Sequence, residues 1–329
     1  MIGELYNTQY HDIDLSKHKF LITGGAGFIG SNLVEYLLRY NAGHVRVLDN
    51  LSNGYYENIS SFVGLTNFEF IEGDIRDFET CRLAVRGINF ISHQAALGSV
   101  PRSINNPLLT NEVNITGFLN MLTAAKDQPS VQRFVYAASS STYGDSPVLP
   151  KVEPVIGKPL SPYAVTKLVN EIYADVFSKV YGFHTIGLRY FNVFGPKQNP
   201  DNPYAAVIPL FIKAAMERER PTIFGDGETS RDFTFVENVI QANIRSLFLR
   251  TISGPIVCNI AFGQEITLNN LWKHISDYLD VCDIKPNYGP VRAGDIKHSL
   301  ADITLAKQIL NYDPGFNVKD GLDLLLKTK

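Results

Sequence analysis

The sequence is poor in cysteine and carries little net charge. Its 329 residues include three cysteines, Cys81, Cys258 and Cys282, and no pair of them has C-x-x-C spacing. This pattern excludes a disulfide framework and gives no sign of a zinc site. The 30 Lys and Arg residues nearly balance the 33 Asp and Glu residues, for a formal net charge of -3. We therefore expect no structural metal and no nucleic-acid partner.

Long hydrophobic runs are also missing. No apolar run approaches the roughly 20 residues that a membrane-spanning helix needs. Residues 1–18 are mostly polar or charged and lack the apolar centre of a signal peptide. We therefore expect a cytoplasmic protein without membrane insertion, in which residues 1–18 form a short N-terminal arm.

Short apolar runs alternate with amphipathic segments from Lys19 onward. This alternation is typical of an α/β protein with a doubly wound, Rossmann-like parallel sheet. A helix is expected at 31–40 and a longer one at 163–180. The expected strands are 20–23, 44–48, 68–71, 90–92, 134–138 and 184–189.

The composition changes after Phe191. Pro196, Pro200, Pro203 and Pro209 fall in a segment that is also rich in Asn, which indicates loops and an inserted lobe. We expect a Rossmann domain at 19–191, to which 232–262 return. Residues 192–231 and 263–329 are expected to form a smaller α/β lobe that binds the substrate.

A glycine-rich turn follows the first expected strand. Gly24, Gly27 and Gly30 stand where a strand gives way to a helix, and Asp49 ends the next strand. A glycine turn alone is often only a tight loop, but this context is the dinucleotide-binding fingerprint. The Asp49 carboxylate is placed for the ribose hydroxyls and favours NAD over a 2′-phosphorylated cofactor. Other residues expected at the cofactor here are Phe28, Ile29, Asn50, Asn53 and Gly54.

A second acidic residue follows the third expected strand. Asp74 and Ile75 come directly after Gly73 and are placed to meet the adenine edge. The alternative is that Asp74 caps a helix beginning near Phe78.

Tyr163 and Lys167 are four residues apart in a predicted helix. This spacing puts them on one helical face, where the ammonium group is expected to lower the phenol pKa from about 10. A phenolate is a usable base. A nicotinamide cofactor is its natural partner, because proton removal from a hydroxyl is productive when a hydride leaves the same carbon.

These features, with further motifs along nearly the whole chain, resemble the extended short-chain dehydrogenase/reductase superfamily, and in particular its NAD-dependent nucleotide-sugar epimerases. The further motifs lie at 93–96, 138–144, 190–196, 225–227, 231–233 and 292–295. The resemblance implies that Tyr163 is the base and acid, that Lys167 holds the nicotinamide ribose, and that Ser139 bonds the sugar 4-hydroxyl with Ser141 beside it.

The resemblance also implies the remaining binding residues. Asn192 would meet the substrate phosphates, Arg231 and Arg292 would clamp them, and Asp295 would take the nucleoside ribose. Either arginine alone would more simply be a solvated surface residue. Further cofactor contacts are implied for Gln94, Ala95, Ala96, Asn111 and Tyr190, and further substrate contacts for Ser99, Arg102, Ser140, Val207, Thr222 and Phe224.

The reaction class follows from what the related enzymes need. Dehydratases and decarboxylases of the superfamily carry carboxylates just after the catalytic serine, where this chain has Ser140, Ser141 and Thr142. Cys81 and Cys258 do not suit the acid–base pair of the epimerase-reductases. The resemblance therefore implies inversion at C4 of a UDP-hexose through a 4-keto sugar, with NAD retained.

Ser299 bears on which sugar is bound. It aligns with a position that is small in epimerases accepting N-acetylated sugars and tyrosine in those restricted to glucose and galactose. The chain thus resembles most the bacterial UDP-N-acetylglucosamine 4-epimerases of surface-polysaccharide pathways, although Ser299 could equally be a packing residue. The alternatives are UDP-glucose or a UDP-uronate, a decarboxylase or dehydratase, and an NAD-dependent sensor. A homodimer through helices at 107–126 and 163–180 is also implied.

Overall fold

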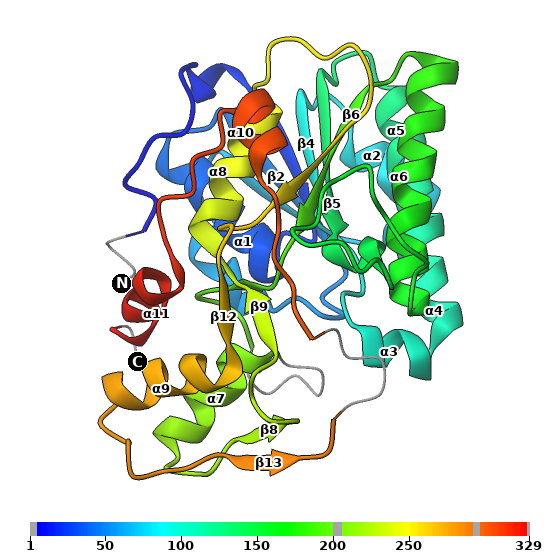
Figure 1. Cartoon of the computed structure of the whole chain (residues 1–329). Helices are drawn as coiled ribbons and strands as arrows, with labels where there is room; N and C mark the ends of the chain where they lie inside the picture. The colour runs from blue at the N-terminus through cyan, green and yellow to red at the C-terminus, as the bar shows by residue number, and fades with distance from the viewer. Residues whose placement is uncertain (1–4, 200–205, 292–296, 328–329) are drawn as a thin grey trace.

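The computed structural model describes residues 5–199, 206–291 and 297–327. Its centre is a seven-stranded parallel sheet in the order β11-β6-β5-β4-β1-β2-β3 (Figure 1). This confirms the expected doubly wound architecture. The strands are β1 (Lys19–Thr23), β2 (His44–Asp49), β3 (Phe68–Glu72), β4 (Phe90–His93), β5 (Arg133–Ser139), β6 (Thr185–Tyr190) and β11 (Ile256–Ile260).

Helices cover both faces of the sheet, so alternate residues of a strand enter different cores. Phe20 and Ile22 of β1 belong to the core under α1 (Phe28–Arg39) and α8 (Val236–Leu247). Leu21 belongs to the second core, under α2 (Phe78–Ala84), α5 (Phe118–Lys126) and α6 (Pro162–Tyr181). Burial on both faces explains why the strands read as continuous apolar runs.

The helix expected at 107–126 is divided. It consists of α4 (Pro107–Asn111), a wide π-helical turn at Glu112–Gly117, and α5. A Cβ atom on Gly117 would lie 2.6 Å from Ile75 Cδ1. The wide turn therefore brings the backbone against the loop after β3, where a side chain would collide.

The smaller lobe follows β6 and lies below the sheet in Figure 1. In it β8 pairs with β13 in parallel and β9 pairs with β12 in antiparallel fashion. The sequence assigns 263–329 to this lobe, yet α10 (Thr304–Leu310) packs against β11 and α8. The other elements of this part are β7 (Val193–Phe194), α7 (Val207–Met216), β8 (Thr222–Phe224), β9 (Ser230–Asp232), β10 (Thr234–Phe235), β12 (Glu265–Thr267), α9 (Leu268–Tyr278), β13 (Asn287–Gly289) and α11 (Val318–Leu326).

Short elements complete the fold. α3 (Val100–Asn105) precedes α4. Single 3-10 turns lie at Leu15–Lys17, Tyr56–Asn58, Ser60–Phe62 and Ser140–Tyr143. Within the described ranges, no helix is both long and apolar enough to cross a membrane.

The N-terminal arm is a packed part of the fold. Tyr6 is fully buried, and its hydroxyl donates a hydrogen bond to Asn32 Oδ1 on α1. The Tyr6 N–H and the Tyr10 hydroxyl both donate to Glu237 Oε1 on α8, at 3.2 and 3.1 Å. The arm therefore ties together the two helices of one sheet face. Its few buried side chains are dispersed among polar residues, which is why no apolar run marks them.

We predict that Tyr6→Phe lowers the free energy of unfolding by about 1–3 kcal/mol, because Asn32 Oδ1 is left buried without this donor. Urea denaturation measures the change. Tyr56→Phe is the matched control, since Tyr56 is 44% exposed and should lose little. Equal stability of the Tyr6→Phe protein and the wild type would show that the arm does not hold α1 in this way.

Candidate active site

Two adjoining cavities lie at the carboxyl ends of the parallel strands. One, of about 520 Å³, extends from the glycine turn to α6, and the other, of about 620 Å³, lies between α7 and β8. Asn192, Val193 and Ala206 line both. Ligands of doubly wound sheets bind at this edge, so the arrangement is suited to a cofactor in one cavity and a substrate reaching into it from the other.

The glycine turn leaves no room for side chains. Gly24 has φ +67°, and a Cβ atom on it would lie 2.7 Å from the backbone nitrogen of Ala95. A Cβ on Gly30 would lie 2.2 Å from the Gly24 oxygen. Gly27 is the N-cap of α1, so the helix N-terminus and its N–H groups face this cavity. The geometry fits a pyrophosphate, which needs close backbone approach and a positive helix end.

Asp49 ends β2 at the wall of the same cavity. Its Oδ2 accepts the Ala26 N–H at 3.0 Å and its Oδ1 accepts the Leu51 N–H at 2.9 Å. Burial raises the pKa of Asp49, while these backbone donors oppose the rise. The carboxylate is thus held in place by backbone and suits the ribose hydroxyls of NAD.

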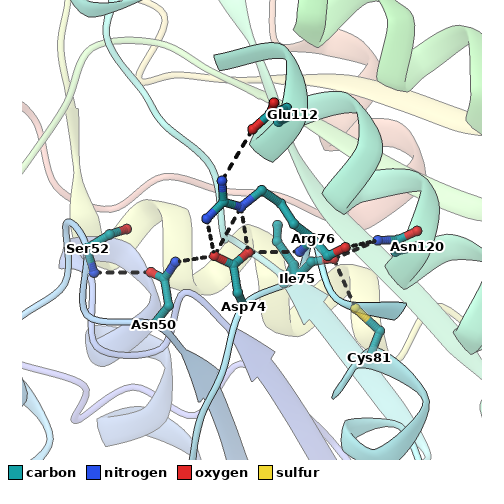
Figure 2. Close-up of polar contacts among 8 residues, drawn as sticks. All are labelled: Asn50, Ser52, Asp74, Ile75, Arg76, Cys81, Glu112 and Asn120. Carbon is teal, nitrogen blue, oxygen red and sulfur yellow. Dashed lines mark hydrogen bonds and ion pairs between the residues drawn. The ribbon is translucent and has the colours of Figure 1, made fainter. Parts of the chain in front are cut away.

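Asp74 is fixed by a neighbour that sequence reasoning missed. Figure 2 shows that Arg76 donates to both Asp74 oxygens and to Glu112, while Asn50, in the loop after β2, also donates to Asp74. The Arg76 guanidinium lowers the pKa of Asp74 to about 2. The carboxylate is therefore ionised throughout the physiological range. An arginine two residues after Asp74 was visible in the sequence, but the bend that folds it back was not.

The alternative role for Asp74 is wrong. The cap of α2 is Asp77, which accepts the N–H groups of Glu79 and Thr80. Asp74 and Ile75 instead line the first cavity. The loop that carries them is held by Asn120, whose side chain donates to the Ile75 and Arg76 carbonyls at 3.0 and 2.9 Å (Figure 2).

The cysteines play no acid–base part at this site. Cys81 is buried and its thiol donates to the Ile75 carbonyl at 3.2 Å. Burial raises the pKa of Cys81 to about 12, and does the same for Cys258. Neither thiol is therefore ionised near neutral pH. No group of three or more His, Cys, Asp or Glu side chains suited to a metal occurs among the described residues.

Asn111 does not reach the cavity. It is exposed on α4, whereas Asn114, three residues later, is buried at the inner side of the wide turn. Asn114 accepts the Leu97 N–H at 2.8 Å and donates to the Leu97 carbonyl and to Thr166. It thereby joins the loop after β4 to α6. Asn114 does not line the first cavity either, so its role in the described residues is to hold these two segments together.

Ser139, Tyr163 and Lys167 meet at the inner end of the first cavity. Ser161 caps α6 by accepting the Ala164 N–H at 3.1 Å, with Pro162 in the first turn, so the helix starts just before Tyr163. The Lys167 Nζ lies 5.9 Å from the centre of the Tyr163 ring and donates to the Ala137 carbonyl at 2.7 Å. The predicted catalytic group is therefore brought together.

The prediction that Lys167 lowers the Tyr163 pKa is wrong in this structure. Burial raises the pKa of Tyr163, and the hydrogen bond with Ser139 opposes that rise. Burial also lowers the pKa of Lys167 to about 8, although Glu171 opposes this. Desolvation disfavours the charged form of each group. At the distance between them, the attraction between the ammonium and the phenolate does not compensate for this effect. Positive charge brought by a bound group would assist ionisation of Tyr163.

The serines at the end of β5 and in the turn that follows lie in two different environments. Ser139 and Ser140 line the first cavity and Ser141 does not. The Ser139 Oγ accepts the Ser141 N–H at 3.1 Å, which fixes the turn. The Ser141 Oγ is buried without a hydrogen-bond partner in the part of the chain that the structure describes. An assisting role for Ser141 stays a prediction.

A polar network lies behind the cofactor wall. The Gln94 amide donates to Ser92 Oγ at 2.8 Å and to the Tyr190 hydroxyl and Asn243 Oδ1 at 3.1 Å. Gln94, Ala95, Ala96 and Tyr190 all line the first cavity, as predicted. Asn243 comes from α8, far away in the sequence and outside any motif, so it was missed.

Most of the predicted nucleotide-binding residues line the second cavity. Asn192, Val207, Thr222, Phe224 and Arg231 line it. Asn192 has φ +35°, and its side chain donates to the Asp232 carbonyl at 3.0 Å. The loop after β6 is thus anchored to β9, next to Arg231.

The other predicted substrate residues lie elsewhere. Ser99 caps α3, and Arg102 donates to Asn53 Oδ1 at 3.0 Å. Neither lines the two cavities, although Asn53 and Gly54 line the first. Ser299 is partly exposed and borders neither wall. Arg292 and Asp295 lie outside the described residues.

Lys197 is another cavity residue that the sequence did not single out. Its ammonium group contacts Glu35 Oε2 at 2.8 Å and donates to the Ser31 carbonyl at 3.3 Å. It therefore draws the loop after β7 onto α1, close to the glycine turn. No motif marks this lysine, because its partners come from a helix distant in the sequence.

We predict that Lys167→Met abolishes activity but stabilises the fold at pH 7. The folded-state pKa of Lys167 is about 8 and the unfolded value is about 10.4, so the buried ammonium costs stability in full below pH 8. That cost disappears as pH rises from about 8 to 10.4. The variant should melt roughly 2–4 °C higher for each kcal/mol removed at pH 7 and lose this advantage by pH 10.

Thermal melts at both pH values measure this effect. Lys179→Met, on the exposed side of α6, is the matched control and should show no such pH-dependent gain. A Lys167→Met protein that melts below the wild type at pH 7 would show that the Ala137 hydrogen bond outweighs the burial cost.

Comparison with known proteins places the chain in a family. The model described as the NAD dependent epimerase/dehydratase family matches residues 20–261. A UDP-glucose 4-epimerase of Mycolicibacterium smegmatis is 34% identical over 308 residues, covering 92% of this chain and 95% of that protein.

Solved structures give the same result. A UDP-N-acetylglucosamine 4-epimerase from Methanobrevibacter ruminantium M1, in complex with UDP-N-acetylmuramic acid, aligns at a TM-score of 0.87 and 38% identity over 95% of this chain and 99% of that chain. A UDP-glucuronic acid 4-epimerase from Bacillus cereus, in complex with UDP-glucuronic acid and NAD, aligns at a TM-score of 0.86 and 30% identity over 94% of this chain and 98% of that chain. The chain therefore belongs to the NAD dependent epimerase/dehydratase family.

Proposed function

We propose that the protein is a UDP-sugar 4-epimerase that interconverts UDP-N-acetylglucosamine and UDP-N-acetylgalactosamine with NAD retained. The observation that carries this is the junction of the two cavities. Tyr163, Lys167 and Ser139 stand at the end of the cavity built on the glycine turn, and Asn192 and Arg231 line the adjoining one. A sugar tethered to a diphosphate in the second cavity would place its ring at Tyr163.

The residues suggest how each part of the reaction proceeds. Tyr163 takes the proton of the 4-hydroxyl, and Ser139, whose hydrogen bond already favours the Tyr163 phenolate, orients that hydroxyl. NAD supplies hydride transfer at C4 when it is bound. Lys167, held by the Ala137 carbonyl, positions the cofactor ribose and adds positive charge near the phenolate.

Inversion needs a ketone that can present its other face. Asn192 and Arg231 hold the diphosphate while the hexose turns about its phosphate linkage, and Tyr163 then returns the proton after hydride arrives on the opposite face. No carboxylate follows Ser139 in the turn Ser140–Tyr143. This favours epimerisation over elimination or decarboxylation, both of which need a further acidic group.

The choice of sugar rests on Ser299. Ser299 lines neither cavity, so the resemblance alone carries this choice: a serine there would leave space for an acetamido group that a tyrosine would fill. The relatives differ in this respect, since their names include UDP-glucose, UDP-N-acetylglucosamine and UDP-glucuronic acid. UDP-glucose and a UDP-uronate are the alternative substrates.

Proton NMR of the purified protein with UDP-N-acetylglucosamine, without added cofactor, tests the proposal. We expect UDP-N-acetylgalactosamine at unchanged mass, and a Tyr163→Phe protein that retains NAD but turns over about 10²–10⁴-fold more slowly. Conversion of UDP-glucose alone would contradict the sugar assignment. Full activity of Tyr163→Phe would remove Tyr163 from the mechanism.

We also propose a homodimer formed through α4 and α6. Val165, Ile172, Val176 and Val180 are 43–64% exposed at spacings that place them along one side of α6. α4 packs beside α6, and its Leu108 is 77% exposed. An apolar surface of this kind marks an interaction site, and its continuation across two helices suits pairing with the same surface of a second copy.

We predict that Ile172→Glu converts the dimer to a monomer, because a charge at the centre of this surface would be buried unpaired. Light scattering after size-exclusion chromatography measures the mass. Tyr278→Glu is the control, since Tyr278 is 42% exposed on α9, in the other lobe. A wild-type protein that elutes as a monomer at micromolar concentration would contradict the proposal.

A further inference from the structure

β9 has two faces with different contacts. Arg231, its central residue, lines the second cavity. Ser230 and Asp232, on either side of it, are buried at 2% and 0% exposure. Because side chains alternate along a strand, these two point away from the cavity that Arg231 lines. A three-residue strand thus presents one side chain to a ligand and two to the protein.

The Asp232 carboxylate holds two segments that are remote in sequence. Its Oδ1 accepts the N–H groups of Phe262 and Gly263 at 3.2 and 3.3 Å, just beyond β11. Its Oδ2 accepts the N–H groups of Gly263 and Ala301 at 3.1 and 3.2 Å. One buried carboxylate therefore joins the end of the main sheet to the segment 297–301.

Ser230 holds the other end of that segment. Its N–H donates to the Lys297 carbonyl at 2.9 Å. Its Oγ donates to Glu265 Oε2 at 2.6 Å and lies 2.8 Å from His298 Nδ1. Ser299 therefore lies between two attachments to β9, one at Lys297 and His298 and the other at Ala301. The main chain of Lys151 also holds this segment, since its N–H donates to the Leu300 carbonyl at 2.8 Å.

We propose that Asp232, together with Ser230, is a positioning residue that fixes the segment around Ser299 relative to Arg231, and so sets how the sugar is recognised separately from the diphosphate. The inference rests on the function proposed above, because it takes Ser299 as the residue facing the sugar. Neither Asp232 nor Ser230 needs to touch a ligand, since the Asp232 carboxylate acts through the Ala301 N–H and the Ser230 hydroxyl acts through the His298 side chain.

The main chain of β9 makes contacts that do not depend on the Asp232 side chain. β9 pairs with β12 through its main chain, and Asn192 donates to the Asp232 carbonyl. These contacts survive a change of the Asp232 side chain, so Arg231 should stay in place. In Asp232→Asn, however, an amide NH2 group replaces one carboxylate oxygen and meets the N–H groups of Phe262 and Gly263 or those of Gly263 and Ala301. Either arrangement weakens the connection between the end of β11 and 297–301 while the diphosphate site remains.

The experiment compares binding of UDP and UDP-N-acetylglucosamine by calorimetry. All proteins are NAD-loaded and carry Tyr163→Phe, so that no turnover alters the sugar. We expect Asp232→Asn to weaken UDP-N-acetylglucosamine at least tenfold while UDP affinity changes by less than threefold. Asp280→Asn, the same change at an exposed site of the smaller lobe, should alter neither constant.

Ser230→Ala provides a second route to the answer. It should weaken the sugar nucleotide at least threefold relative to UDP, whereas Ser276→Ala, a buried serine bonded within α9, should not. If Asp232→Asn does not fold, the Ser230 pair decides by the same criterion. An unchanged ratio, or equal weakening of UDP and the sugar nucleotide, overturns the proposal. Failure of the proposed function would appear separately, as absent turnover in the NMR assay.

Discussion

The site depends on parallel pairing, which brings the carboxyl ends of seven strands to one edge of a sheet. Gly24, Asp49, Gln94, Ser139 and Tyr190 each stand at or just after the end of a different strand, and all line one cavity. No strand carries more than a fragment of the site. The register between neighbours, with β1 paired to β2 and β4 residue by residue, sets the distances between the fragments. Catalytic geometry is in this sense a property of the sheet.

Sequence reasoning succeeded where a residue's neighbours are local. Six of the seven parallel strands were expected as short apolar runs, and the glycine turn, Asp49 and the pair Tyr163 and Lys167 are each placed by the strand or helix that carries them. It failed where a distant segment decides. Asn111 was assigned to the cofactor although it is exposed on α4, because the wide turn after it has no clear sequence signal, and the buried contacts of the N-terminal arm depend on Glu237, far along the chain.

Burial explains the electrostatic error. The four-residue spacing of Tyr163 and Lys167 was correctly understood, but the sequence does not show how deeply a helix face is buried. Here the same burial that shields the pair from water raises the phenol pKa and lowers the ammonium pKa. Lys167 therefore carries less positive charge than an exposed lysine would, and it stabilises the Tyr163 phenolate less. In such a site, positive charge on a bound ligand would assist ionisation of Tyr163.

Several buried charged residues among those that the structure describes differ in what holds them. Arg189 and Glu171 are 5% and 9% exposed and form an ion pair, so each is compensated by the other and serves packing. Asp49 and Asp232 are held instead by backbone N–H groups, and Lys167 by a backbone carbonyl. Backbone dipoles fix the position of a charge without neutralising it, so its field can still act on a ligand or order a loop. Burying such a group costs stability, and Asp49 and Lys167 bring that cost to the wall of the first cavity.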